Sequence, residues 1–154
     1  MTPGAAPVDP AGMGREDRTR EVARLGYGLV AWAFLACVLV QAYLVGVDVF
    51  SEGDGAAHRD FAYLYGWLTP VLVLLAAAAR LPRGTRALTI VLLVLYAVQT
   101  VLPSQKDAFP LLAALHTPNA LAIFAIAIVL ARRAPPLANW REAFRRTGGG
   151  RPRA

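Results

Sequence analysis

The sequence predicts an all-α integral membrane protein, a bundle of four transmembrane helices. Hydrophobic residues make up 56% of its 154 residues, more than an ordinary soluble domain carries. Four uncharged stretches are long enough, or nearly long enough, to cross the roughly 30 Å of bilayer hydrocarbon as helices. Arginines gather at the ends of these stretches, and strand alternation is absent, which argues against a membrane barrel.

The four spans are expected at about residues 24–47, 57–80, 86–103 and 108–132, within a transmembrane domain of residues 21–133. Thr69-Pro70 should bend the second span, with the threonine hydroxyl satisfying a backbone group that the proline frees.

The two ends of the chain have compositions different from that of the spans. Residues 1–20 begin with a Pro- and Gly-rich stretch and are expected to be a disordered cytoplasmic segment. Residues 134–154 form a basic cytoplasmic tail, in which Trp140 and Phe144 lie among arginines. Such a tail is either a solvated positive flank or a segment that rests on an anionic membrane surface.

The distribution of basic residues predicts the orientation. Of the 16 lysines and arginines, only Arg59 and Lys106 lie on one side of the membrane, at the start of span two and in the loop after span three. The other 14 precede span one, join spans two and three, or follow span four, so the positive-inside rule places both termini in the cytoplasm. Fifteen arginines against one lysine are typical of a high-GC bacterial genome, which indicates a bacterial inner membrane.

The same distribution predicts the partners. The positive charge is explained by the membrane topology, so no nucleic-acid partner is expected. Membrane lipids are the expected contact, and another membrane subunit or a second copy of the chain is a further candidate.

Polar residues inside the spans repeat at a fixed spacing. Gln41 and Gln99 are 58 residues apart, and so are His58 and His116, with 17 residues from glutamine to histidine in each case. The spacing predicts a duplicated helical hairpin, with spans one and two equivalent to spans three and four as a parallel repeat. Gln41, Gln99 and Asn119 are then expected to be structural polar residues that hydrogen-bond between helices.

The number of residues between each histidine and the next cytoplasmic arginine disagrees with the equivalence of the two hairpins. His58 lies 22 residues before Arg80, whereas His116 lies only 16 residues before Arg132. In straight helices this difference corresponds to a depth mismatch of roughly 9 Å. Helix tilt or a bend near Pro118 would have to absorb it.

The two histidines are candidate ligands for a cofactor. Neutral imidazoles bind haem iron, and helical bundles build cofactor sites from side chains on facing helices. His58 and His116, on diagonal spans, could hold one haem b from both faces. Gly66 would leave room for the porphyrin, and Arg59 could meet a propionate.

The histidines could instead have plainer roles. His58 could mark the membrane interface, and His116 could hydrogen-bond Thr117, Asn119 or a backbone carbonyl. Zinc would need both histidines and a nearby aspartate, without the short ligand spacings of known zinc motifs. A proton relay would need polar residues through the inner half of span four, which has none from Ala120 to Ala131. Nucleophile, phosphate-loop and zinc-protease motifs are absent, so catalytic residues are not assigned and an enzyme is the less expected class.

Three motifs carry a family resemblance. Val-Gln-Ala-Tyr-Leu-Val-Gly ends span one, Ala-His-Arg-Asp-Phe-Ala-Tyr-Leu-Tyr-Gly opens span two, and Ala-Leu-His-Thr-Pro-Asn-Ala-Leu lies in span four. Over roughly residues 24–133 the chain resembles a family of small bacterial four-helix membrane proteins, domain of unknown function 6220. That resemblance implies the fold and no activity.

A second, shorter likeness is to haem A synthase. Each four-helix half of that enzyme carries haem-ligating histidines at the positions of His58 and His116. The glutamate of the enzyme's Glu-x-x-His-Arg motif is replaced here by Gly55. The likeness therefore implies at most a haem-binding, electron-transfer half-unit.

Two functions follow from these observations. The first is a small inner-membrane protein that binds b-type haem between spans two and four for electron transfer. The second is a cofactor-free membrane scaffold or accessory subunit of a larger membrane complex.

Overall fold

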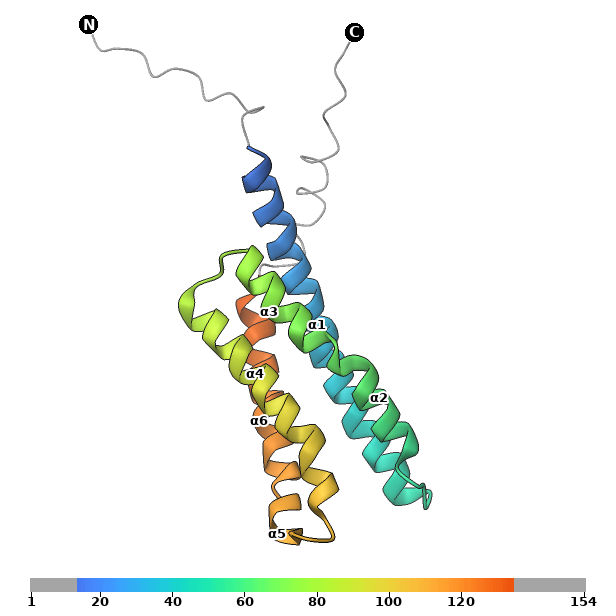
Figure 1. Cartoon of the computed structure of the whole chain (residues 1–154). Helices are drawn as coiled ribbons and strands as arrows, with labels where there is room; N and C mark the ends of the chain where they lie inside the picture. The colour runs from blue at the N-terminus through green and yellow to red at the C-terminus, as the bar shows by residue number, and fades with distance from the viewer. Residues whose placement is uncertain (1–13, 135–154) are drawn as a thin grey trace, which may run out of the picture.

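The computed structural model describes residues 14–134 of the chain, which are helical apart from short turns (Figure 1). The elements are α1 (Arg15–Phe50), α2 (Ala56–Gly66), α3 (Leu68–Ala78), α4 (Arg83–Val101), the 3-10 helix η1 (Leu102–Gln105), α5 (Pro110–Ala113) and α6 (His116–Arg133). Four segments are long and apolar enough to cross a membrane, namely Glu16–Phe50, Ala56–Ala78, Arg83–Gln105 and Pro110–Arg133. The predicted all-α bundle with four candidate spans is confirmed.

The helix α1 begins earlier than expected. Disorder was predicted through residue 20, but the helix starts at Arg15, so the last part of that prediction is wrong. Glu16 and Asp17 lie in the first turn, where carboxylates interact favourably with the helix dipole. Arg20 pairs with both, at 3.2 Å and 3.6 Å. At 36 residues α1 is roughly 54 Å long, so its charged first turns extend beyond the hydrocarbon.

Residues 1–13 and 135–154 lie outside the described part of the chain. Disorder before residue 14 and the basic tail with Trp140 and Phe144 therefore stay predictions.

The second span bends as the sequence predicts. It is divided into α2 and α3 at Trp67, three residues before Pro70. Proline has no N–H, so the carbonyl four residues earlier, that of Gly66, loses its helical donor. The hydroxyl of Thr69 donates a hydrogen bond of 2.9 Å to that carbonyl. The freed backbone group is therefore satisfied inside the span.

The helices pack as two equivalent hairpins. The helix α1 packs against α3 within the first hairpin, and α4 packs against α6 within the second. Between hairpins α3 packs against α4, and α1 against α6, so the order around the bundle is α1, α3, α4, α6. Each contact has a counterpart in the other half, as a pseudo-two-fold axis along the bundle requires.

The two ends of the bundle differ in composition. The start of α1, the α3–α4 turn and the end of α6 lie together at one end, which we call the arginine end (Figure 1). The α1–α2 turn, η1 and α5 form the opposite end, which we call the histidine end. The two hairpins lie close together at the arginine end and diverge toward the histidine end (Figure 1).

Buried positions repeat with the same spacing as the glutamines and histidines. Six pairs of core residues, each pair 58 positions apart, are no more than 7% exposed. The pairs are Tyr27 with Thr85, Ala31 with Thr89, Phe34 with Leu92, Tyr65 with Ile123, Thr69 with Ala127 and Leu72 with Leu130. Equivalent positions of the two hairpins therefore face the same core, which supports the predicted duplication.

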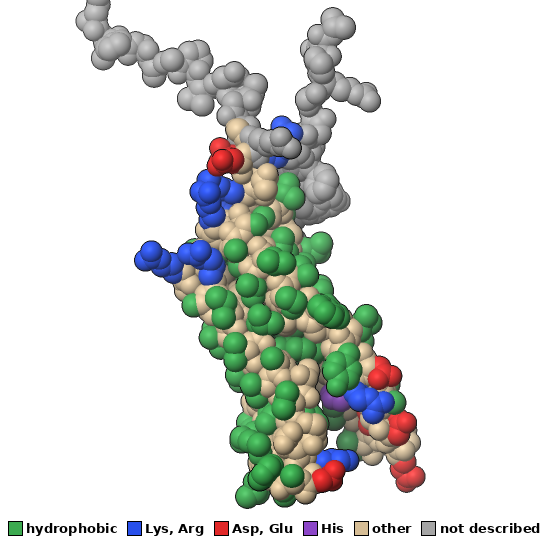
Figure 2. Space-filling model, viewed as in Figure 1, with side chains coloured by type: hydrophobic (Ala, Val, Ile, Leu, Met, Phe, Trp, Pro, Cys, Tyr) green, Lys and Arg blue, Asp and Glu red, His purple; other side chains and the backbone are tan. Residues whose placement is uncertain are grey.

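The outer surface is apolar around the bundle. Large side chains such as Leu29, Leu74 and Leu121 are more than 60% exposed, and hydrophobic side chains are spread along the bundle in Figure 2. An apolar surface of this extent would be unfavourable in water and matches lipid contact. The described residues therefore form a multi-pass membrane domain.

Candidate functional site

Polar side chains from both hairpins meet at the histidine end. We call this set the polar cluster; it consists of Gln41, His58, Gln99, His116 and Asn119. All five side chains are half-buried. The ring centroids of His58 and His116 are 6.4 Å apart, with the ring planes at 67°. The two histidines, predicted to be equivalent, are therefore neighbours across the bundle.

The second hairpin holds its histidine in a complete network. Asn119 Nδ2 donates to the Leu95 carbonyl at 2.9 Å and to Gln99 Oε1 at 2.6 Å. With its oxygen used in this way, Gln99 presents Nε2 as a donor to His116 Nε2 at 3.1 Å. His116 Nδ1 lies 3.2 Å from the backbone carbonyl of Gln99. The partners therefore assign the proton to Nδ1 and the lone pair to Nε2 of His116.

The first hairpin holds its histidine incompletely. Gln41 Nε2 donates to the His58 carbonyl at 2.8 Å and lies 3.3 Å from His58 Nε2, which again assigns the lone pair to Nε2. Gln41 Oε1 and His58 Nδ1 are buried and have no hydrogen-bond partner among the described residues. The position equivalent to Asn119, 58 residues earlier, is Phe61. Because Phe61 offers no amide, the oxygen of Gln41 lacks the donor that Gln99 has.

The separation of the histidine rings suits two ligands of one iron. An iron–nitrogen bond takes about 2 Å and the centre of an imidazole lies about 1 Å beyond its nitrogen, so the centroids of two ligands are about 6 Å apart. The observed 6.4 Å agrees with this separation. An Nδ1–H that donates to a backbone carbonyl, as in His116, is also the arrangement that orients metal-binding histidines.

The space beside Gly66 does not have the role expected of it. A side-chain carbon at Gly66 would lie 2.7 Å from Cε1 of Tyr96, so that ring already fills the space. The hydroxyl of Tyr96 donates to the Ala62 carbonyl at 2.6 Å, which fixes the ring over α2. The expectation that Gly66 leaves room for a porphyrin is therefore wrong. Figure 2 shows instead a hollow between the two hairpins at the histidine end, with histidine at its inner limit.

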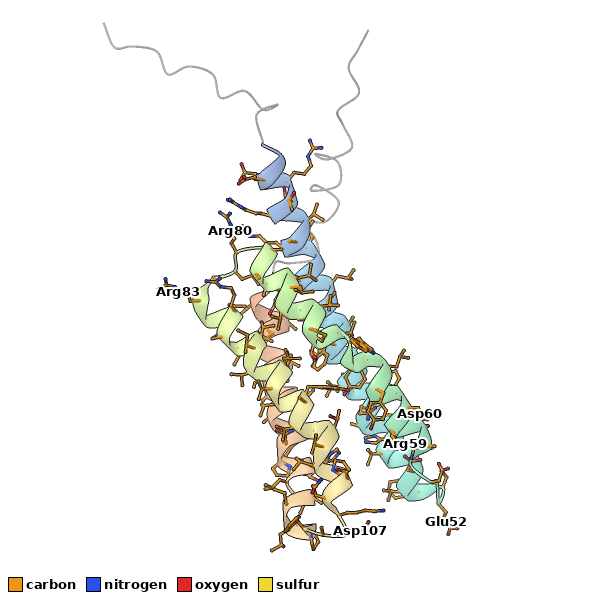
Figure 3. The ribbon with its side chains drawn as sticks, viewed as in Figure 1. Glu52, Arg59, Asp60, Arg80, Arg83 and Asp107 are labelled. Atoms are coloured by element: carbon orange, nitrogen blue, oxygen red, sulfur yellow. The ribbon has the colours of Figure 1, made fainter. Side chains whose placement is uncertain are left out.

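Arg59 is directed to a carboxylate of its own helix. Its Nε lies 3.5 Å from Oδ1 of Asp60, and both side chains are exposed near Glu52 at the start of α2 (Figure 3). A role for Arg59 toward a propionate stays a prediction.

Aromatic rings close the core directly below the polar cluster. Tyr65 lies 5.5 Å from Phe34, 5.3 Å from Phe61 and 5.3 Å from Tyr96, measured between ring centroids. Offset and edge contacts at these distances are favourable and leave little space for water. The 58-residue spacing pairs Phe34 with Leu92, Tyr65 with Ile123 and Tyr96 with Val38, so it is consistent with core positions for these three rings. Phe61 is paired with the polar Asn119 and is not marked in this way.

The zinc alternative lacks a third ligand. Within residues 14–134, no three His, Cys, Asp or Glu side chains are grouped so that they could hold a metal ion. A zinc site made of both histidines and a carboxylate is therefore not formed in that part of the chain.

Comparison with known proteins supports the family resemblance over part of the chain. The sequence model of a family of unknown function, DUF6220, matches residues 41–105, a stretch that runs from Gln41 through His58 and Gln99. No curated protein and no solved structure matches the chain. The likeness to haem A synthase stays a prediction.

Proposed function

We propose that this membrane protein binds one haem b through His58 and His116 and serves in electron transfer. The observation that carries the proposal is the 6.4 Å separation between the rings of two histidines from separate hairpins. They are the only histidines in the chain. When bound, haem b would supply a one-electron redox couple.

The residues of the chain have distinct parts in this proposal. His58 and His116 would hold the haem from separate hairpins. Gln41 and Gln99 hold the imidazoles, because each amide donates toward Nε2 and so keeps the lone pair on that atom. Nε2 has a single lone pair, so haem iron would replace the amide as the partner of each Nε2. The ring cluster of Phe34, Tyr65 and Tyr96 would exclude water from the side facing the core.

The proposal includes an orientation in the bacterial inner membrane. The described arginines lie mainly at the end of the bundle where α1 begins and α6 ends (Figure 2). The positive-inside rule assigns that end to the cytoplasm and the polar cluster to the opposite half of the bilayer. A haem there would be within reach of redox partners on the outer side.

The test is a spectrum of the purified protein. The protein is expressed with a haem precursor and purified in mild detergent. The absorbance spectrum of the oxidised protein is then subtracted from that of the reduced protein. We expect a b-type band in the wild type and in the exposed control Ser104→Ala, and its loss in His58→Ala and in His116→Ala. Methionine at either position would keep a ligand and shift the band.

Two results contradict the proposal. If added hemin produces no b-type band in the well-folded wild type, the polar cluster is structural, and the cofactor-free scaffold or accessory subunit becomes the better explanation. If both alanine variants keep the wild-type band, haem binds elsewhere. Elution as a single species in size-exclusion chromatography shows which variants are folded.

A further inference from the structure

A groove opens between α3 and α4 at the arginine end, far from the polar cluster. It has a volume of about 340 Å³. Val73 and Ala77 of α3 and Ile90 of α4 are among its apolar walls, while Arg83 and Arg86 lie at its mouth. We call it the arginine groove. It combines an apolar slot in a membrane span with two cations where the span ends.

The two arginines are available to bind an anion. Arg83 and Arg86 are three residues apart, so they project from one side of α4. Both are exposed, and neither pairs with an acidic side chain within residues 14–134. Guanidinium groups bind phosphate oxygens with two parallel hydrogen bonds. Figure 3 shows Arg83 at the start of α4, extending away from the bundle.

A second cavity at the same end provides a contrast. It measures about 350 Å³ and is lined by Glu16 and Arg20 of α1 and by Arg80. Arg20 is paired there with Glu16 at 3.2 Å and with Asp17 at 3.6 Å. Carboxylates therefore offset the charge of Arg20, and that of Glu16 in the lining would repel an anion. Among the residues that the structure describes, none that lines the arginine groove is acidic.

We propose that the arginine groove binds an anionic phospholipid. The phosphodiester pairs with Arg83 and Arg86, and an acyl chain lies along the alanine-rich faces of α3 and α4. The position of the groove along the span suits a phospholipid. Its arginines lie where α4 begins, at the level of a head group, and its apolar walls continue toward Val73 and Ile90, inside the span. Basic pockets between transmembrane helices at this level bind anionic head groups. The proposal does not depend on haem.

The test compares lipids and matched charge variants. Bound lipid is counted by native mass spectrometry after exposure to phosphatidylglycerol or phosphatidylcholine of equal chain length. Arg83→Gln/Arg86→Gln removes the two groove charges, and Arg132→Gln/Arg133→Gln removes two charges from the end of α6. We expect the wild type and the α6 variant to prefer phosphatidylglycerol, and the groove variant to bind it roughly 30-fold more weakly, at about fivefold for each arginine.

A further variant and a competitor separate lipid from free anion. Ala77→Leu keeps both arginines but fills the apolar slot, so it should also lose the bound lipid. Inorganic phosphate at millimolar concentration should not displace the lipid. The proposal is overturned if the groove variant keeps the preference, if the α6 variant loses it equally, if phosphatidylcholine binds as well, or if inorganic phosphate competes.

Discussion

Replacing Gly66 by alanine tests how tightly the two hairpins pack below the polar cluster. The added methyl group would lie 2.7 Å from Cε1 of Tyr96 and 3.3 Å from its Cζ and Oη. Tyr96 is 6% exposed, its ring contacts Phe34 and Tyr65, and its hydroxyl is bonded to the Ala62 carbonyl. The ring therefore cannot move aside without breaking these contacts.

The expected loss of stability follows from three contributions. Overpacking costs about 1–3 kcal/mol, and losing the Tyr96 hydrogen bond costs about 1 kcal/mol. The higher helix propensity of alanine offsets up to about 1 kcal/mol of this loss. The free energy of unfolding of Gly66→Ala should therefore fall by about 1–3 kcal/mol. For a domain of this size that lowers the melting temperature by roughly 4 °C per kcal/mol.

The assay is thermal unfolding in mild detergent, followed by circular dichroism. Gly46→Ala is the matched control, because Gly46 also lies inside a helix and no atom of residues 14–134 lies within 4 Å of an added methyl group there. Its melting temperature should stay unchanged or rise. Combining Gly66→Ala with Tyr96→Leu should recover part of the loss caused by the first change. If Gly66→Ala is as stable as Gly46→Ala, the close packing of α2 against α4 is refuted.

Three further predictions concern the core, the polar cluster and the topology. Thr89→Val should lower the free energy of unfolding by about 1–2 kcal/mol, because it removes the buried 2.8 Å hydrogen bond to the Tyr27 hydroxyl. Thr100→Val, which removes only an exposed hydrogen bond, should leave the free energy of unfolding nearly unchanged. Denaturation in mixed micelles measures both variants. Asn119→Leu should cost about 1–3 kcal/mol by leaving Gln99 Oε1 without its donor, and stability equal to that of the wild type would contradict the network. Alkaline phosphatase fused to the C-terminus should be inactive in cells and a fluorescent protein there should fluoresce; the opposite pattern would reverse the orientation.

The spans and the bend were predictable because they depend on local chemistry. Long uncharged runs flanked by arginine require helices in a bilayer, and Pro70 removes one particular donor wherever the helix packs. The Thr69 hydroxyl was then the nearest group able to satisfy the Gly66 carbonyl. The equal glutamine–histidine spacing predicted that His58 and His116 are equivalent, and the structure brings their rings together.

Counting depth from the arginines was misleading for a physical reason. It treated Arg80 and Arg132 as markers of the same depth, but the position equivalent to Arg132 in the first hairpin is Leu74. By equivalent positions, Arg132 of α6 therefore lies about two helical turns deeper in the bundle than Arg80 of the α3–α4 turn. The equivalent pair Leu72 and Leu130 is 1% exposed in both hairpins, so the helices themselves are in register.

The occupant of the space beside Gly66 could not be predicted from the sequence. A glycine in a span shows that something approaches closely, but not whether it is a cofactor or a neighbouring side chain. Tyr96 belongs to the other hairpin, 30 residues away, and only the packing of the two hairpins places it there. The unpaired oxygen of Gln41 likewise appears only when Phe61 is seen to occupy the position of Asn119.

A chain made of two equivalent hairpins carries its own dimerisation partner. A single hairpin of this kind could close the core only by associating with a second hairpin in the same orientation. Because one chain carries both hairpins, their sequences can differ, and Asn119 in one half with Phe61 at the equivalent position of the other is a difference that no homodimer could hold.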